Sequence, residues 1–313
     1  MRTGRTWFFL LSLLLVCAGF FAGSCQGAQI SEYRVIRQPV TDASRTQLIA
    51  IRSYRSDGVA HLLAVDPVTF QSFDLPASGL RPVRVSADIP GSTPYLKAVE
   101  RYTAAPYKLQ NGGATRAAAA VDGVFLTVDL CPSRRPFERE MFEATAAQGK
   151  GKPAPVAVSI TGIWLEKHPE ELAYLKKEAA AGRLAITWVN HSYHHPYQPK
   201  VPLQQNFLLT PGTDFTREVL DLEQQLLAHG LVPSPFFRFP GLVSDGSSMK
   251  RLRLLSLIPV GSDAWLAKGE SPRKGSFILV HGNGNEPKGV KLLLPMLKAE
   301  QLRLLPLAAA FGE

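Results

Sequence analysis

The sequence predicts an α/β protein in which a parallel sheet, repeated as strand–helix units around a barrel, follows a small β-rich region. From about residue 121 onward, strand-like and helix-like segments alternate, and hairpin signals are few. The length of this part suits a (β/α) barrel, and an open doubly wound sheet is the alternative. Apolar residues make up 45% of the 313 residues, which excludes a disordered or fibrous chain because a core can form.

The first 28 residues have the pattern of an export signal. Arg2 and Arg5 precede an unbroken apolar run over residues 7–16, and small residues follow to Ala28. The run is shorter than the roughly 20 residues of a spanning helix, unless residues 17–21 extend it into an uncleaved anchor. Cys25 lies behind three small residues and weakly resembles the lipid-acceptor cysteine of bacterial lipoproteins. We expect export to the periplasm or cell envelope, with membrane attachment only through an uncleaved signal or a lipid on Cys25.

The distribution of Lys and Arg residues along the mature chain argues against a nucleic-acid partner. Removal of Arg2 and Arg5 lowers the formal net charge from +9 to +7. The remaining Lys and Arg residues are scattered, with only short clusters such as residues 250–253, so no basic stripe is formed. A charge of this sign suits an anionic envelope polymer, although a solvated basic surface is the simpler explanation.

Residues 29–90 are expected to form the small β-rich region. Segments 46–54 and 59–65 flank Asp57-Gly58, a dipeptide typical of a two-residue hairpin turn, and residues 66–75 offer a further strand. Residues 91–120 are interpreted as a linker that contains a short helix near 96–103, the sequence Asn111-Gly112-Gly113 and an alanine run.

Residues 121–313 are expected to form the barrel domain. Apolar runs predict strands at 124–128, 155–160, 184–189, 276–280 and 302–307, and short apolar segments lie at 235–237 and 259–260. Amphipathic or helix-like segments cover 137–148, 169–181, 216–229, 250–257 and 290–300. Active sites in such folds lie at the carboxyl ends of the strands, so the residues that follow the strands are the candidates.

Polar side chains follow most of these strands. They are Asp129, the run Asn190 to His195, Arg238, Asp263 and His281. Taken singly, each has a structural explanation: Asp129 and Asp263 can cap helices, and His281 can be a hydrogen-bonded core histidine. Their recurrence at strand ends favours one common site. Within it, the i, i+4 spacing of His191 and His195 allows two imidazoles to converge on one metal ion.

This ordered set resembles the polysaccharide deacetylases, the NodB-homology family also known as carbohydrate esterase family four. The family motif Thr-Phe-Asp-Asp-Gly-Pro corresponds to residues 127–132, and the motif His-Ser/Thr-x-x-His corresponds to residues 191–195. Further matches are Arg-x-Pro at 238–240, a loose Asp and Trp match at 263–265, and Leu-x-His at 279–281. The resemblance covers about residues 121–307 and leaves residues 29–120 outside.

The resemblance implies a distorted (β/α) barrel and metal-dependent removal of N-acetyl, or occasionally O-acetyl, groups from an amino-sugar polysaccharide or peptidoglycan. A divalent ion, zinc foremost with cobalt or nickel as alternatives, would be held by His191 and His195. The resemblance further implies that Asp129 is the general base, that Arg238 orients it, and that His281 is the general acid. Asp263 would tune the pKa of His281 or the charge of Arg238. The implied substrate contacts are Trp265, Tyr193 and Pro240.

The first motif departs from the family pattern at two positions. The family's second aspartate, a metal ligand, is Leu130 here, and its glycine is Cys131. Asp129 could move onto the metal, another carboxylate such as Glu138 could replace the ligand, the metal could bind weakly, or the domain could be inactive. We expect Leu130→Asp to tighten metal binding. Cys131 itself is interpreted as a small buried side chain.

Two functions from different classes therefore remain. The first is an exported metal-dependent deacetylase. The second is a non-catalytic glycan-binding or scaffolding protein on the same barrel, for which the replacement of a metal ligand by Leu130 is the discriminating feature.

Overall fold

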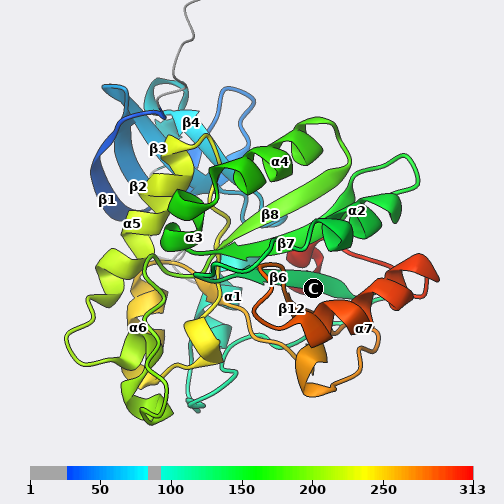
Figure 1. Cartoon of the computed structure of the whole chain (residues 1–313). Coiled ribbons are helices and arrows are strands. Elements are labelled where there is room, and N and C mark those ends of the chain that lie inside the picture. The colour runs from blue at the N-terminus through cyan, green and yellow to red at the C-terminus, as the bar shows by residue number, and fades with distance from the viewer. Residues whose placement is uncertain (1–26, 84–92, 313) are drawn as a thin grey trace, which may run out of the picture.

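The computed structural model describes residues 27–83 and 93–312 and contains two sheets (Figure 1). One is a five-stranded antiparallel sheet near the N-terminus, and the other is a seven-stranded parallel sheet with helices against it. The predicted α/β class with a preceding β region is confirmed. The signal segment, with its candidate lipid site at Cys25, lies outside the described residues apart from its last two positions. Within the described ranges, no helix combines the length and apolarity needed to cross a bilayer.

The N-terminal sheet has the order β4-β3-β2-β1-β5. Its strands are β1 (Ile30–Thr41), β2 (Gln47–Ser56), β3 (Val59–Val65), β4 (Ser72–Pro76) and β5 (Arg81–Pro82). The predicted turn between β2 and β3 is present, with φ of 49° at Asp57 and 80° at Gly58. Two consecutive positive φ angles match the twist of a hairpin, which explains the preference for these residue types.

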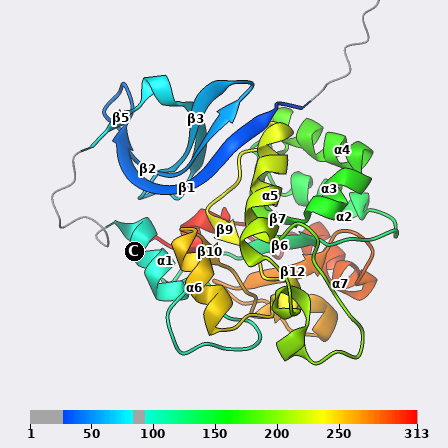
Figure 2. The ribbon, with the colours of Figure 1, turned by 90° about the vertical axis from the view of Figure 1, so that its left-hand side faces the viewer.

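The N-terminal sheet packs directly on the rest of the molecule and is not a separate module. Figure 2 shows it beside helix α5 (Phe215–Ala228). Arg52 from β2 forms a bidentate ion pair with Glu223 of α5, at 2.7 and 2.9 Å, and both side chains are fully buried. Tyr33 donates a further hydrogen bond to Glu223. Apolar side chains of β2 and β3 belong to the same core cluster as barrel residues such as Phe236.

The parallel sheet has the order β10-β9-β8-β7-β6-β12-β11. Its strands are β6 (Phe125–Leu130), β7 (Ala154–Ile160), β8 (Leu184–Asn190), β9 (Phe236–Phe237), β10 (Ile258–Pro259), β11 (Ala264–Trp265) and β12 (Phe277–His281). Among these strands, β10 and β11 are edges and do not pair with each other, so the curled sheet is an open barrel. The distorted barrel is therefore confirmed, with β9 to β11 reduced to two residues each.

Side chains alternate between the two faces of the sheet, and this alternation positions the site. In β6, Leu126, Val128 and Leu130 belong to the cluster packed against the outer helices. Phe125 belongs instead to the inner cluster, and Thr127 and Asp129 follow it on that inner face. The inner face is apolar at the start of the strands and becomes polar at their carboxyl ends.

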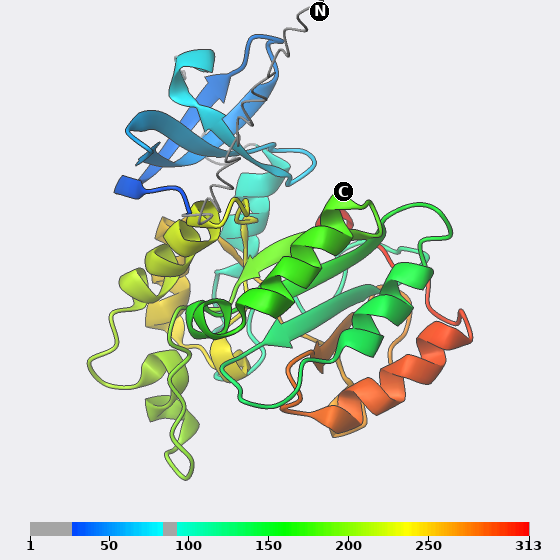
Figure 3. The ribbon, with the colours of Figure 1, turned by 45° about the horizontal axis from the view of Figure 1, so that its top comes forward.

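Helices α2 (Arg139–Ala147), α4 (Pro169–Ala180) and α7 (Pro287–Lys298) follow their strands much as predicted, and the short helix α3 (Gly162–Lys167) was not predicted. Figure 3 shows α4, α2 and α7 side by side across the outside of the parallel sheet. Helix α6 (Gly246–Leu254) begins four residues before the predicted helix, because Asp245 and Ser248 form a capping box.

Residues 91–120, expected to be a linker with a short helix near 96–103, contain that helix and also pack against the barrel. Helix α1 (Pro94–Tyr102) buries Tyr95 and Val99 and contacts β10. Further on, Ala114 bridges to Val260 beyond β10, and Arg116 bridges to Ser276 before β12, so the segment connects both sides of the open barrel. The prediction of a last strand at 302–307 is wrong, because Leu304 makes only an isolated bridge to Val124.

Candidate active site at the strand ends

The carboxyl ends of the parallel strands open into a cavity of about 790 Å³. Strands β6, β8 and β12 and the loops that follow them supply much of its polar lining, which includes Asp129, Cys131, His191, His195, His281 and Glu286. Three of the expected strand ends thus meet in one place. The side chains are spread over more than 150 residues of the chain, from Asp129 to Glu286, and the parallel sheet brings them together.

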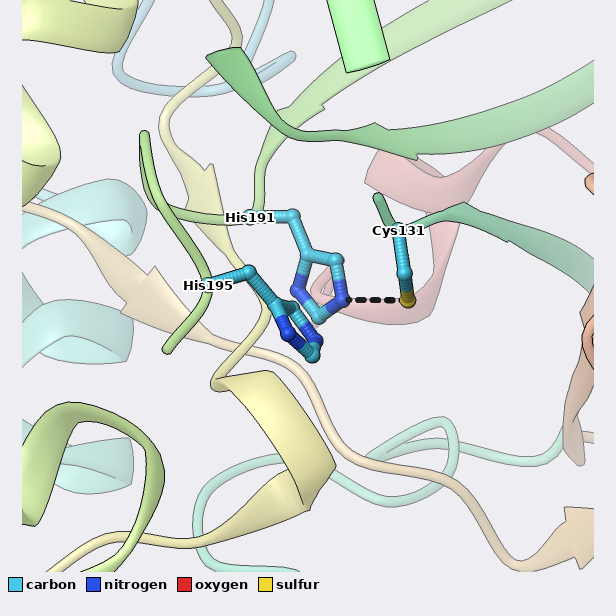
Figure 4. A group of neighbouring side chains, drawn as sticks. All are labelled: Cys131, His191 and His195. Atoms are coloured by element: carbon cyan, nitrogen blue, oxygen red, sulfur yellow. Dashed lines mark hydrogen bonds between the residues drawn. The ribbon is translucent and has the colours of Figure 1, made fainter. Parts of the chain in front are cut away.

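Three metal-binding side chains converge in this cavity. Figure 4 shows Cys131 at the end of β6 pointing toward His191 and His195, which lie beyond β8. One ligand atom from each of the three lies within 4.8 Å of the others, and Sγ of Cys131 is 3.5 Å from Nε2 of His191. Cys131 and His191 are buried, and His195 is partly exposed.

The tautomer of His191 suits metal binding. Its Nδ1 lies 2.8 Å from the carbonyl oxygen of Arg238, so Nδ1 carries the hydrogen and donates it. Nε2 then presents its lone pair toward Cys131 and toward Oδ2 of Asp129, which is 3.7 Å away. A ring N–H donated to a backbone carbonyl is the usual support of a metal-bound histidine. The donor set therefore fits a divalent ion.

The histidine pair lies on an irregular loop and not on a helix. Ser192 and His195 have φ of 66° and 49°, and the backbone N–H of His195 donates to Oγ of Ser192. The intervening His194 pairs with Glu218 on α5 through its ring and its backbone N–H, at 2.7 and 2.9 Å. Glu218 thereby holds the loop that carries both candidate ligands.

Asp129 lies beside Arg238 in the buried base of the cavity. Nη1 of Arg238 is 3.8 Å from Oδ1 of Asp129, and Nη2 donates to Oγ1 of Thr127 at 2.7 Å. Burial lowers the pKa of Arg238, and Asp129 acts in the opposite direction. Oδ1 of Asp129 has no hydrogen-bond partner among the described residues and faces Nη1 of Arg238, whereas Oδ2 faces Nε2 of His191.

Position 130 does not face this cavity, so the structure does not support the expected tightening of metal binding by Leu130→Asp. Leu130 is fully buried in the outer cluster near Met141, on the face of β6 opposite to Asp129. The next inward position is Cys131. The sequence reasoning missed this side chain as a site residue, although the period of two along a strand was sufficient to find it. Glu138 starts α2 and does not line the cavity.

His281 is held by a residue that the sequence reasoning also missed. Nδ1 of His281 lies 2.9 Å from Oε2 of Glu286, although the approach is too oblique for a hydrogen bond. The same carboxylate oxygen accepts a hydrogen bond of 2.6 Å from the indole N–H of Trp265. Burial acts to lower the pKa of His281, but Cys131, Glu286 and Asp129 outweigh it and raise this pKa well above its ordinary value.

Asp263 does not tune His281 or Arg238. Its Oδ1 accepts a hydrogen bond from the backbone N–H of Phe277 at the start of β12, and its other oxygen lies 3.9 Å from Arg116 and from Arg273. It is thus near the amino end of β12, away from the residues that line the cavity. The reason is that Asp263 precedes its short strand β11 and does not follow it. Glu286 takes the position beside His281.

Of the three residues expected to contact the substrate, one lines the cavity and two do not. Trp265 lines the cavity, but Tyr193 turns toward α3, where its hydroxyl donates to Glu166. Pro240 is buried at the start of a 3₁₀ turn, and the following Gly241 lines the cavity instead. The outer wall is formed by Tyr197 stacked on Phe207, with ring centroids 5.1 Å apart. No sequence signal identified this pair, because it lies in the long segment between β8 and α5.

No family model matches the chain. A family 4 carbohydrate esterase from Bacillus anthracis is similar, with a TM-score of 0.46 and 17% identity over 63% of this chain and 86% of that chain. A chitin deacetylase from Colletotrichum lindemuthianum is similar with a TM-score of 0.45 and 15% identity, over 65% of this chain and 93% of that chain. A pseudoenzyme of the same esterase family from Bacillus anthracis is similar with a TM-score of 0.41 and 13% identity, over 61% of this chain and 66% of that chain. The chain thus resembles carbohydrate esterases of family four, among which both enzymes and a pseudoenzyme are found.

Proposed function

We propose that this protein is an exported, metal-dependent deacetylase that hydrolyses N-acetyl groups on an amino-sugar polymer of the cell envelope. One observation carries the proposal. The strand ends bring a buried carboxylate, two imidazoles suited to bind a metal and a separate, carboxylate-paired imidazole into one cavity. Hydrolysis of an unactivated amide requires a Lewis acid, a general base and a general acid, and these groups can supply all three once a metal is bound.

His191 and His195 would hold the ion from the loop after β8. When bound, the ion supplies the Lewis acid that polarises the acetyl carbonyl and makes a water molecule acidic near neutral pH. Asp129 accepts the proton that the attacking water loses. Arg238 orients Asp129 and places a positive charge 3.8 Å from its Oδ1. Asp129 is therefore the general base.

His281 completes the reaction from the neighbouring strand. Burial acts to lower its pKa, but Cys131, Glu286 and Asp129 outweigh burial and raise this pKa well above the ordinary value, which favours the protonated imidazole. It donates that proton to the nitrogen of the departing amine as the C–N bond breaks, which gives acetate and a free amino sugar. Glu286 holds the imidazole in place and stabilises its charged form.

The walls of the cavity suit a sugar. Tyr197 is 59% exposed and lines the cavity, and Trp265, with Lys268 over one ring face, lies beside His281. Aromatic faces pack well against the C–H faces of pyranose rings, since they offer a large apolar area with little loss of conformational entropy. The expected +7 charge of the mature chain supports an anionic envelope polymer, such as peptidoglycan, as substrate.

The test is acetate release from acetylated chitooligosaccharides and from peptidoglycan by the metal-free protein supplied with zinc, cobalt or nickel. We expect acetate in proportion to bound metal, and a loss of about 100-fold or more in Asp129→Asn with metal retained. Asp122→Asn is a matched control, since Asp122 is exposed and pairs with Lys274 and Arg303 far from the strand ends. Binding of these glycans without acetate release under any metal would instead support the non-catalytic reading.

Export is proposed from the first 28 residues. Mass spectrometry of the secreted or envelope-bound protein would identify the mature N-terminus, and a diacylglycerol mass on Cys25 would establish lipidation. A protein that keeps Met1 and remains in the cytoplasm would contradict export.

A further inference from the structure

We infer that Cys131 is a metal ligand, so that the centre proposed above is a thiolate site with the donor set Cys131, His191 and His195. The inference rests on the proposed function only for the presence of a metal. It assigns to this chain a sulfur ligand and restores the negative charge that the hydrocarbon at position 130 cannot supply.

The distances agree with tetrahedral zinc. With Zn–S near 2.3 Å and Zn–N near 2.0–2.1 Å, a tetrahedral angle places sulfur and nitrogen about 3.5 Å apart. Sγ of Cys131 and Nε2 of His191 are 3.5 Å apart. His195 completes a group within 4.8 Å, so a small movement of its partly exposed ring closes the site. Three protein ligands and one open position are the usual arrangement of a catalytic zinc ion.

The backbone that carries Cys131 is fixed from both neighbouring strands. The side-chain amide of Asn283, beyond β12, donates to the carbonyl of Cys131 at 2.6 Å. Thr161, at the end of β7, donates to the carbonyl of Leu130, and Gly282 donates to that of Asp129. The thiol is therefore aimed into the cavity by three consecutive anchored carbonyls, as a ligand requires.

The arrangement also divides the two acidic groups by task. Asp129 is paired with Arg238 and remains free to accept a proton, which a carboxylate bound to the ion would do less well. Cys131 supplies the negative charge directly to the ion. A thiolate with two imidazoles favours zinc or cobalt over magnesium, calcium or manganese, which prefer oxygen ligands.

The experiment is cobalt substitution of the whole protein, followed by ultraviolet and visible spectroscopy. We expect a sulfur-to-cobalt charge-transfer band in the wild type. In Cys131→Asp, which keeps a negative ligand, cobalt should remain bound and the band should disappear. In Cys131→Ala, zinc affinity should fall by more than about 100-fold, which exceeds the loss typical of an outer-shell partner. Leu130→Met is the matched control and should change neither the band nor the affinity.

A second measurement does not depend on these variants folding. Alkylation by iodoacetamide, located by peptide mass, should modify Cys131 in the metal-free wild type and be blocked by one equivalent of zinc. Stoichiometric cobalt without a thiolate band, or alkylation of Cys131 at the same rate with zinc bound, would overturn the inference.

These outcomes separate the ligand assignment from the proposed activity. A thiolate band with no acetate release from any substrate removes the deacetylase and leaves the ligand assignment intact. Metal-dependent acetate release without the thiolate band supports the deacetylase and removes the assignment of Cys131 as a ligand. Acetate release that persists without metal and is abolished by alkylation would make Cys131 a nucleophile, and both statements would then be wrong.

Discussion

Asp129 and His281 are register partners on adjacent parallel strands, β6 and β12. Side chains of register partners point to the same face of a sheet, and neighbouring strands are about 4.8 Å apart. The proposed base and the proposed acid are therefore placed by backbone pairing and not by a flexible loop. Their separation is set by the strand spacing, which suits a reaction in which a proton is removed from water and one is delivered to the amine.

Glu286→Gln should shift the pH dependence of kcat/KM. Glu286 raises the pKa of His281, and activity requires His281 protonated, so activity is lost as pH rises through this pKa. Removal of the carboxylate charge lowers the pKa and moves the basic limb of the profile to lower pH. Asp263→Asn is the matched control, because Asp263 contacts the amino end of β12. Equal profiles for Glu286→Gln and wild type would exclude Glu286 as the partner of His281.

Leu130→Asp should destabilise the fold without tightening metal binding. The substitution removes a leucine side chain from a tight outer cluster and buries a carboxylate there, at a cost of at least about 3 kcal/mol in the free energy of unfolding. Leu130→Met conserves volume and should cost less than about 1.5 kcal/mol. Urea denaturation measures both. A variant as stable as wild type that binds zinc more tightly would mean that position 130 reaches the site after all.

Arg52→Ala should destabilise the protein by about 3–5 kcal/mol, because it leaves Glu223 as an unpaired charge in the interior. The double variant Arg52→Met with Glu223→Leu should recover much of this loss, since two apolar side chains need no partner. The free energy of unfolding of both singles and the double gives the coupling. Additive effects would show that the two side chains act independently.

Tyr197→Ala should weaken the binding of oligosaccharides by about 5- to 10-fold and raise KM, with little effect on kcat. The ring stacks on Phe207 at the mouth and is remote from the buried acid and base. Tyr107→Ala is a suitable control, because Tyr107 is also exposed but does not line the cavity. A fall in kcat with unchanged KM would place Tyr197 in the chemistry instead of at the sugar-binding wall.

The sequence predicted the long parallel strands and most of the helices beside them well, since apolar periodicity marks them directly, but it gave no bounds for β1 and missed α3. It also predicted that Asp129, His191, His195, Arg238 and His281 meet, because parallel strands deliver their ends to one edge. Asp263 was misplaced because two-residue strands leave no periodic signal for where a strand ends. Glu286 could not be inferred, since its contact with His281 depends on the turn that leads into α7.

The buried pair between Arg52 and Glu223 determines how much of the chain is needed for a working protein. Helix α5 carries Glu223, which is paired with the N-terminal sheet, and Glu218, which holds the loop of His191 and His195. A chain shortened to residues 121–313 would lose the ion-pair partner of Glu223 and would expose the apolar surface that β2 and β3 cover. The smallest active unit should therefore begin at β1, and a search for relatives by the barrel alone underestimates the extent of the domain.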